Sequence, residues 1–550
     1  MFYFFVIIFL LAFVILAWRK LDLSVMFIIA GLPLYLVRFK VFGVPMTLLE
    51  AMILIAFFIW LVFKTRFWDF LRGHYGLKDF LKNSPFARAG SAEGRRKYPF
   101  GIEAILLLLI SLIAVGAAGF SAGSLGIWKA YFFEPILLYT LILNIFPGKE
   151  RKIIFSLAIG VFLVSVYAVW QKFTGFGIDN PLWQAEATRR VVSFFGYPNA
   201  VGLYLAPIIP ILTAFLFLPP KKEFSFRGSV AEYRFGLNFH ILVNFFKNIS
   251  ADITISPSIF LKKFPQNLKN LFSKSIRRQT PWEEKIIFPL KKENISALGL
   301  SKGFLTFIIL LSLSAIVFAG SEGALVGLAV AFIIGGLLGN KKTRLVVLAL
   351  AVAAVITVSL VPNGLKTVEQ KLTLKDFSGQ VRRYQWKETL IMLNHGRFYQ
   401  GAGLDNYQQA ITPYHQPGFF YDDGTDPLFH QHTVESAEYR AKTWRPVEIY
   451  MYPHNIILNF WSELGLAGMF LFVWIIGKFV VGSWQLAVRS KNNDVRFLAL
   501  GLLGAMVIII VHGLVDVPYF KNDLSCLFWI LMAILALSDL KEKNKQIENK

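Results

Sequence analysis

The sequence is poor in charge, in acidic residues and in cysteine. Charged residues occupy 17% of the 550 positions, whereas a soluble domain has about a quarter. The 34 Asp and Glu face 57 Lys and Arg, which gives a net charge of +23 at pH 7. The single cysteine, Cys526, lies inside an apolar run, so the chain cannot build a disulfide framework. The composition therefore excludes an ordinary soluble domain and a disulfide-stapled scaffold.

Several catalytic and binding signatures are also missing. The chain has no Walker loop, no dinucleotide-binding glycine pattern and no GxSxG turn. One group of potential cation ligands occurs, namely Asp422, Asp423, Asp426, His430 and His432. These residues share a polar stretch typical of a solvated loop, so we expect neither a metal nor a cofactor. The basic residues gather in particular loops, so we do not expect nucleic acid as a partner.

Long apolar runs fill much of the chain, in which hydrophobic residues reach 55%. A membrane helix needs about 20 apolar residues, and backbone groups in lipid must bond internally, which favours helices. We therefore predict an all-α polytopic membrane protein. The thirteen predicted spans are residues 2–18, 21–37, 44–63, 102–118, 128–146, 153–171, 198–218, 303–319, 323–338, 345–361, 454–477, 497–517 and 524–537. Only Arg19 and Lys20 separate the first two, so twelve spans remain an alternative. The N-terminal run lacks the features of a cleaved signal peptide, and we expect it to be retained.

Lys and Arg are distributed unevenly between the loops, and in membrane proteins they favour the cytoplasmic side. One alternating set of loops carries 40 of the 57 Lys and Arg, and the other set carries 17. We predict that the richer set is cytoplasmic, with the C-terminus inside and the N-terminus outside. Six parts follow: N-terminal helices with about seven spans (1–218), a basic cytoplasmic insert (219–302), three central spans (303–361), an extracytoplasmic loop (362–453), three C-terminal spans (454–537) and a cytoplasmic tail (538–550).

The two long loops differ in charge. Segment 219–302 has 15 Lys and Arg against 6 Asp and Glu, with amphiphilic stretches such as FHILVNFFKNI. This pattern predicts an insert that lies on anionic lipid headgroups. Segment 362–453 has 10 basic and 10 acidic residues, and long ordered loops are usually functional. We expect it to form short helices, one around 380–394, and to cap the membrane domain.

The first candidate motif is RRVVSFFGYPNAVGLYL, which begins at Arg189 and leads into a predicted span. Arg189 and Arg190 would lie just above the bilayer, and the PNA sequence that contains Asn199 breaks or starts the helix. The positive charges are ordinary as a helix flank, but arginine is disfavoured on the outer face. Its planar guanidinium suits bidentate phosphate binding, which favours a functional interpretation.

The second motif is VRRYQWKETLIMLNHGRFYQGAGLDNY, from Val381 to Tyr407. It contains Arg382, Arg383 and, four residues after Arg382 and on the same helix face, Trp386. The GAGLDNY sequence predicts a glycine-built turn. Taken alone, the motif favours an ordinary surface helix followed by a turn.

The third motif is YPHNIILNFWSELGLAGMFLFVW, where the outer loop re-enters the membrane. His454 stands at this point with Asn455 beside it and Glu463 deeper in the span. An imidazole accepts protons near neutral pH, and ionisable groups inside membranes are functional candidates. His512 and Asp516 are four residues apart near the outer end of another span, where a packing hydrogen bond is the alternative.

Four sequence elements resemble the superfamily of bacterial O-antigen ligases and polymerases. They occur in the superfamily's order: RVVSFFGYPNAVGLYL at 190–205, R-x-x-x-W followed by GAGLDNY, PHNIILNFWSELGLAG at 453–468, and GLVDVPYF at 513–520. The resemblance spans roughly residues 100–535. It implies a GT-C-like helical bundle of 12–13 spans in the cytoplasmic (inner) membrane, with a large outer loop before the last three.

The resemblance also implies a chemistry. The donor would be a glycan linked to undecaprenyl pyrophosphate, the acceptor a hydroxyl of a glycan, lipid or protein, and no nucleotide sugar or metal would be needed. Arg190 would bind the pyrophosphate, with Arg189, Arg382 and Arg383 as further donor contacts. His454 would be the catalytic base. Supporting positions would be Asn199, Asn455, Glu463, Glu322, His512 and Asp516.

One residue departs from the family pattern. The family often has S-R-G-A on a short outer turn, with the arginine on phosphate, whereas this chain has Ser321-Glu322-Gly323-Ala324. A carboxylate at this place repels pyrophosphate unless it is paired, and Arg190 or Arg382 is the expected partner of Glu322.

The resemblance implies a metal-independent inverting glycosyltransferase in cell-surface polysaccharide synthesis. A ligase, a polymerase and a protein O-oligosaccharyltransferase remain alternatives, because the outer loop would select the acceptor. A transporter or flippase is the competing class. It predicts broken helices, internal repeats and charges at the bilayer midplane, whereas these ionisable residues gather at the outer interface.

Overall fold

The computed structural model describes residues 1–41, 44–64, 98–218, 302–339 and 341–548, all within one structural unit. Nine of the described helices are long and apolar enough to cross a membrane, and four shorter apolar helices accompany them. The prediction of an all-α, multi-pass membrane protein is confirmed. The predicted basic insert lies outside the described residues, except for Lys302. The predicted division into six parts stays a prediction.

The first helices follow the predicted spans, with two exceptions: the predicted span 21–37 is an α-helix only as far as Ala30, and the predicted span 44–63 begins as a strand. The elements are α1 (Phe2–Arg19), α2 (Leu21–Ala30), a 3-10 helix (Leu32–Leu36), strands β1 (Arg38–Val41) and β2 (Val44–Thr47), and α3 (Leu48–Lys64). Residues 44–47, predicted within a span, form β2, which pairs antiparallel with β1. Thr47 and Glu50 then bond each other's backbone amides, an arrangement that starts α3.

The next elements lead to the first candidate motif. They are α8 (Gly101–Ala117), α9 (Ala122–Trp128), a π-helical turn (Lys129–Phe133), α10 (Glu134–Ile145), α11 (Glu150–Thr174), α12 (Pro181–Gln184), a 3-10 helix (Glu186–Thr188), α13 (Pro198–Leu205) and α14 (Ile209–Leu216). The predicted span 198–218 is thus two helices. Pro207 and Pro210 lack amide hydrogens, so the helical hydrogen-bond ladder is interrupted between them.

The remaining elements form the central helices, the long loop and the C-terminal helices. They are α19 (Lys302–Ala319), α20 (Glu322–Leu338), α21 (Lys341–Leu360), α22 (Gly364–Leu372), α23 (Phe377–Met392), a π-helical turn (Leu393–Arg397), α24 (Tyr407–Ile411), a 3-10 helix (Thr412–Tyr414), β3 (Gly418–Phe420), α25 (Phe429–Glu435), α26 (Ala437–Thr443), β4 (Trp444–Pro446), α27 (Ile456–Arg489), α28 (Asn493–Gly513) and α29 (Asn522–Glu548). Strands β3 and β4 pair antiparallel. The short helix expected around 380–394 is confirmed as α23. Helices α27 and α29 continue beyond the predicted spans.

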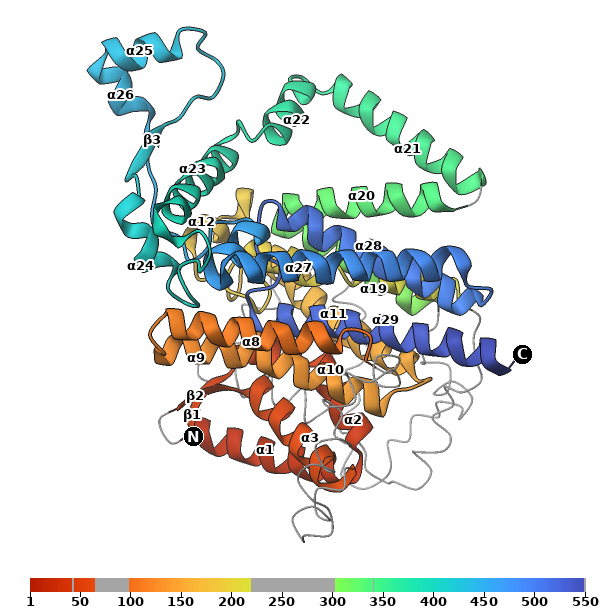
Figure 1. Ribbon diagram of the computed structural model, residues 1–550. Coiled ribbons are helices and arrows are strands. Elements are labelled where there is room, and N and C mark those ends of the chain that lie inside the picture. The colour runs from red at the N-terminus through yellow and green to blue at the C-terminus, as the bar shows by residue number, and fades with distance from the viewer. Residues whose placement is uncertain (42–43, 65–97, 219–301, 340, 549–550) are drawn as a thin grey trace, which may run out of the picture. The chain divides into compact units, whose positions relative to one another are not determined.

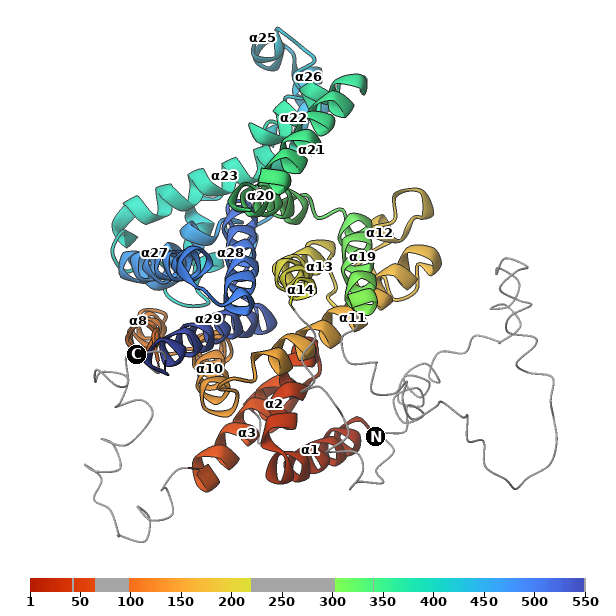
Figure 2. The same ribbon diagram turned by 90° about the vertical axis from the view of Figure 1, so that its right-hand side faces the viewer.

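The apolar helices lie side by side, and α1 begins at the end opposite to that at which α29 finishes (Figure 1). Helix α28 packs against α20, α27 and α14 (Figure 2). We call the end of the bundle where residues 190–199, 319–323, 454–456 and 512–522 lie the site end. The loop helices from α23 to α26 lie at this end (Figure 1).

An aromatic cluster fixes the short segment between α28 and α29. The Phe460 and Phe472 rings stack with centroids 3.7 Å apart, and Phe460 also contacts Tyr519 at 5.2 Å. The Tyr519 hydroxyl donates to the Tyr131 carbonyl (2.9 Å) and accepts from Trp529 Nε1 (3.3 Å). Each aromatic pair contributes about 0.5–1.5 kcal/mol beyond the area it buries. The segment that carries Asp516 is therefore held firmly against α27 and α29.

Candidate active site

Asp516 is the centre of a polar network at the site end. Its Oδ2 accepts a hydrogen bond from Asn199 Nδ2 (3.3 Å), and its Oδ1 accepts from the Val517 amide (2.8 Å). Oδ1 lies 3.7 Å from His454 Nδ1, and Oδ2 lies 3.9 Å from His512 Nε2. Burial raises the pKa of Asp516, but the two histidines and the amide outweigh it and lower the pKa to about 2. The carboxylate is therefore charged at neutral pH.

His454 immediately precedes Asn455, the residue that caps α27. Its φ of 46° is in the left-handed region, an unfavourable conformation for a residue with a side chain. The side chain is 32% exposed, and the Tyr450 ring packs edge-on against the imidazole at 5.3 Å. Nδ1 faces Asp516, and Nε2 has no hydrogen-bond partner in the part of the chain that the structure describes. A carboxylate at Nδ1 favours the tautomer whose Nε2 accepts a proton.

Asn455 holds the start of α27 in place. Its Oδ1 accepts from the amides of Ile457 and Leu458, both at 3.0 Å, which is an N-terminal cap. Its Nδ2 donates to the Leu514 carbonyl at 3.1 Å. One side chain thus joins the first turn of α27 to the segment that carries Asp516, and it fixes the position of His454 between them.

Arg190 lies at the other end of the network. Its Nε donates to the Ala319 carbonyl (2.9 Å), and its Nη2 donates to the Gly320 carbonyl (3.1 Å) and to Asn199 Oδ1 (3.3 Å). Partial burial lowers the pKa of Arg190 and the Glu322 carboxylate opposes this shift, but an arginine remains protonated. A chain of contacts therefore runs from Arg190 through Asn199 and Asp516 to His454.

The neighbouring Arg189 makes contacts of another kind. Its Nη1 donates to the Lys172 carbonyl (2.9 Å) and its Nε to the Gln184 carbonyl (3.0 Å). In return, Lys172 Nζ donates to the Arg189 carbonyl (3.0 Å). Because Lys172 lies in the last turn of α11, the guanidinium satisfies a carbonyl at the negative end of that helix. The predicted donor contact of Arg189 stays a prediction, and its observed contacts support the fold.

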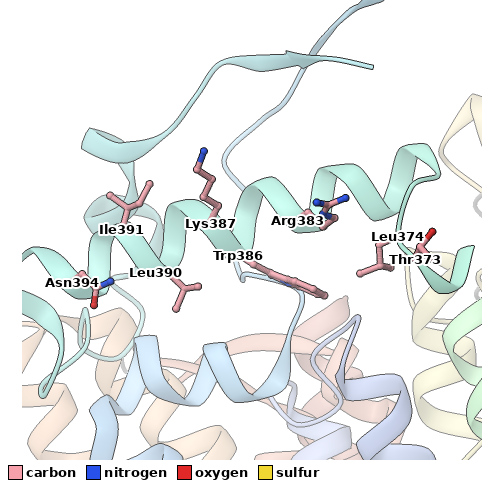
Figure 3. Close-up of a pocket in the computed structure, with 8 residues that line it drawn as sticks. All are labelled: Thr373, Leu374, Arg383, Trp386, Lys387, Leu390, Ile391 and Asn394. Atoms are coloured by element: carbon pink, nitrogen blue, oxygen red, sulfur yellow. The ribbon is translucent and has the colours of Figure 1, made fainter. Parts of the chain in front are cut away.

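Arg382 and Arg383 lie just after the first turn of α23, and their side chains contact different parts of the protein. Arg382 is half-buried, and its Nε donates to the Val515 carbonyl at 2.9 Å, next to Asp516. Arg383 is exposed and lines an open groove along α23, with Trp386 beside it (Figure 3). The structure therefore brings Arg382 to the polar network and leaves Arg383 outside it.

The Glu322 carboxylate is paired, but not with the expected arginines. Its Oε1 forms an ion pair with Lys371 of α22, and both side chains are exposed. The expectation that Arg190 or Arg382 pairs with it is corrected: Lys371 is the residue within ion-pair distance among the described residues. The next residue, Gly323, lies directly against the His512 ring, where a Cβ would come within 2.5 Å of His512 Cδ2.

Glu463 belongs to a separate contact. Its buried carboxylate accepts from the Asp405 amide at 2.7 Å, and burial raises the pKa of Asp405. Gly465, two residues after Glu463, has a φ of 73°, and a Cβ there would clash with the Tyr399 carbonyl. The Ala402 amide also donates to the Ser462 carbonyl at 2.6 Å. Glu463 and the GAGLDNY turn thus fasten the long loop to a kink in α27.

The potential cation ligands of the long loop form an internal network. Asp426 Oδ2 accepts from the Tyr439 hydroxyl (2.6 Å) and contacts His432 Nδ1 (2.7 Å). Across the described residues, no group of three or more His, Cys, Asp or Glu is placed to hold a metal ion. The expectation of a metal-free reaction concerns the chemistry itself and stays a prediction.

Sequence reasoning missed three contributors to this region. Lys371 pairs with Glu322, Gly323 makes room for His512, and the Lys521 ammonium lies 4.2 Å from the Phe195 ring centroid. Lys521 directly follows the GLVDVPYF element, and this position in the sequence could have indicated that it lies near the site. The other two depend on tertiary contacts that leave no local pattern.

One part of the chain is similar to a known protein family. Residues 307–473, from α19 to the first half of α27, match the family model of the O-antigen ligase. None of the curated proteins compared with the chain matches it. The matched range includes Glu322, Arg382, His454 and Glu463, whereas Arg190, Asn199 and Asp516 lie outside it.

Proposed function

From the domain of the O-antigen ligase superfamily that this chain carries, we propose that it transfers a glycan from undecaprenyl pyrophosphate to an acceptor hydroxyl. The reaction would take place on the outer face of the cytoplasmic membrane, in the synthesis of a cell-surface polysaccharide. One observation carries the proposal: a His–Asp pair and an arginine are joined through Asn199 at one end of a membrane bundle. A base and a phosphate-binding cation are the two groups that this reaction needs.

His454 is the proposed base. Its Nε2 takes the proton of the acceptor hydroxyl as that oxygen attacks the anomeric carbon of the donor. The new glycosidic bond forms while the bond between the anomeric carbon and the pyrophosphate oxygen breaks, so undecaprenyl pyrophosphate leaves with the electron pair. Attack from the side opposite the leaving group inverts the anomeric centre. Asp516 orients the imidazole and stabilises its positive charge.

Arg190 is the proposed cation for the leaving group. Its Nε and Nη2 are bonded to protein oxygens, and its Nη1 makes no hydrogen bond to any residue that the structure describes. Two N–H groups therefore remain for a phosphate oxygen, held by a guanidinium that is already oriented. Arg382 supplies a second positive charge. Its Nε donates to the carbonyl of Val515, the residue that precedes Asp516. Because these charges stabilise the pyrophosphate, we expect transfer to continue in EDTA.

The topology follows from the charge distribution. The site end would face away from the cytoplasm, with the N-terminus outside and the C-terminus inside. Reporter fusions after residues 70, 250 and 420 test this orientation: the first two should report a cytoplasmic position and the third an external one. The reverse pattern would contradict the proposed side of the reaction.

A transfer assay with purified protein tests the function. It supplies an undecaprenyl-pyrophosphate-linked glycan with candidate acceptors and compares wild type with His454→Ala and Arg190→Ala. The matched control is His432→Ala, which disrupts another His–Asp pair. We expect both site variants to lose transfer and the control to keep it.

The products of the assay separate the alternatives. Glycan on a foreign acceptor indicates a ligase, and a longer glycan on the same carrier indicates a polymerase. Movement of glycan across the membrane without a new glycosidic bond would favour a transporter. Wild-type rates in both site variants would refute the site.

A further inference from the structure

An open groove runs along the exposed face of α23, next to the network but separate from it. Its volume is about 490 Å³, within the range of small-ligand sites. The lining residues from this helix are Arg383, Trp386, Lys387, Leu390 and Ile391, followed by Asn394. They recur every three or four positions, so they share one helix face. Thr373 and Leu374 close the end nearest α22 (Figure 3).

The lining combines an aromatic surface with positive charge. In Figure 3, Trp386, Leu390 and Asn394 lie along one edge of this helix face, and Lys387 and Ile391 lie along its other edge. No lining residue is acidic. Neither Arg383 nor Lys387 forms an ion pair with another residue in the described ranges, and both are exposed. The groove therefore presents cations without a protein counter-charge, and an anionic ligand would complement it.

Trp386 carries an unsatisfied donor. Its indole Nε1 is buried and has no hydrogen-bond partner among the described residues. A buried donor without a partner is unfavourable, and such groups in folded proteins require an explanation. Because Nε1 is covered, a ligand hydroxyl accepts from it only if the indole ring turns toward the groove.

The opposite face of α23 is anchored, which makes the groove preorganised. The Glu388 carboxylate accepts from the Gln416 amide (2.7 Å), and the Thr389 hydroxyl is bonded to the Tyr407 hydroxyl (2.8 Å). Asp376 caps the start of the helix. Arg382, beside the groove, is bonded to the carbonyl next to Asp516. A ligand in the groove is thus held in a fixed position relative to His454.

We propose that this groove binds an acidic sugar unit of a glycan substrate. The apolar face of the sugar ring stacks on Trp386, and its carboxylate or phosphate pairs with Arg383 and with the Lys387 ammonium, which its flexible stem carries to the ligand. The inference rests on the proposed function, because it assigns the glycan of that reaction to the acidic class. It names the sugar chemistry recognised and leaves open whether donor or acceptor carries it.

A binding experiment with the purified full-length chain tests the groove without any reaction. The probes are fluorescently labelled tetragalacturonate and the same oligosaccharide with its carboxyl groups methyl-esterified. We expect the acid to bind about tenfold more tightly than the ester, with an advantage that falls as salt increases. The double variant Arg383→Gln/Lys387→Gln should abolish that advantage, and Trp386→Ala should weaken both probes. The control Lys375→Gln removes a nearby exposed charge outside the groove and should bind as wild type.

Two results would overturn the inference: equal binding of acid and ester by wild type, or wild-type binding by the groove variants. The transfer assay decides whether the groove binds the donor or the acceptor, because the acidic sugar can be placed on either substrate. The double variant should raise the KM of the acidic substrate only, and unchanged KM values in both arms would count against the groove. The two failures give different results. If the proposed function is wrong, the wild-type protein transfers no glycan but still binds the acidic probe.

Discussion

Asp516→Asn is the most informative single change, because it removes one charge and keeps the size of the side chain. At 3.7 Å from His454 Nδ1, and with an effective dielectric constant of about 20, the carboxylate stabilises a positive imidazole by roughly 4 kcal/mol. The His454 side chain is 32% exposed, and solvent screening reduces this energy to about 2 kcal/mol at the lower limit. The transferase rate should therefore fall by about 30- to 1000-fold.

The assay for this prediction is single-turnover glycan transfer with saturating donor, which isolates the chemical step from donor binding. The control is Asp426→Asn, which removes the carboxylate of another His–Asp pair, 2.7 Å apart in the long loop. That variant should transfer at the wild-type rate. If Asp516→Asn transfers within about threefold of wild type while unfolding at the wild-type temperature, Asp516 does not support the proposed base.

Three further predictions concern charge pairing, packing and pH. Lys371→Gln should weaken donor binding several-fold because it leaves the Glu322 carboxylate unpaired, and adding Glu322→Gln should restore affinity; a donor titration measures both, and no rescue would contradict the pairing. Gly323→Val should destabilise the fold by about 1–3 kcal/mol because its side chain meets a buried imidazole. Thermal unfolding should show no such loss for Gly335→Ala, whose Cβ meets nothing within 4 Å. The pKa of Asp516, lowered from 3.8 to about 2, stabilises the fold by about 2 kcal/mol above roughly pH 4, and this contribution is lost as pH falls toward 2. Wild-type unfolding temperatures should therefore fall more steeply over that interval than those of Asp516→Asn, and parallel curves would refute the shift.

The membrane helices were predictable because each depends on a local run of apolar residues. The departures arise where another local force wins. Residues 44–47 pair with β1. Pro207 and Pro210 interrupt the helix inside the predicted span 198–218, although residues 198–216 are still long and apolar enough to cross a membrane. Helices α27 and α29 continue to Arg489 and Glu548. The polar residues beyond the apolar run also favour the helical conformation, so the helix extends past the predicted end of the span.

The candidate site was predictable as a set of residues but not as an arrangement. Arg189 and Arg190 are adjacent, yet their guanidinium groups bond to carbonyls in different parts of the fold, because neighbouring side chains on extended backbone point to opposite sides. The partner of Glu322 is Lys371, 49 positions further along. Such contacts depend on how the helices pack, and no local sequence pattern indicates them.

The hydrogen bond between Asn199 and Asp516 closes a loop of 317 positions, and this has a consequence for biogenesis. Helices enter a membrane in the order in which the ribosome makes them, so Arg190 and Asn199 are in place long before α28 is synthesised. Until the turn after α28 arrives, Asn199 and His454 both lack Asp516, the carboxylate that they share. The His454–Asp516 pair on which the proposed activity depends is therefore complete only when the last pair of helices has been made. When the chain is divided after residue 489 and both fragments are co-expressed, the proposed glycan transfer should return only if the second fragment inserts into the membrane.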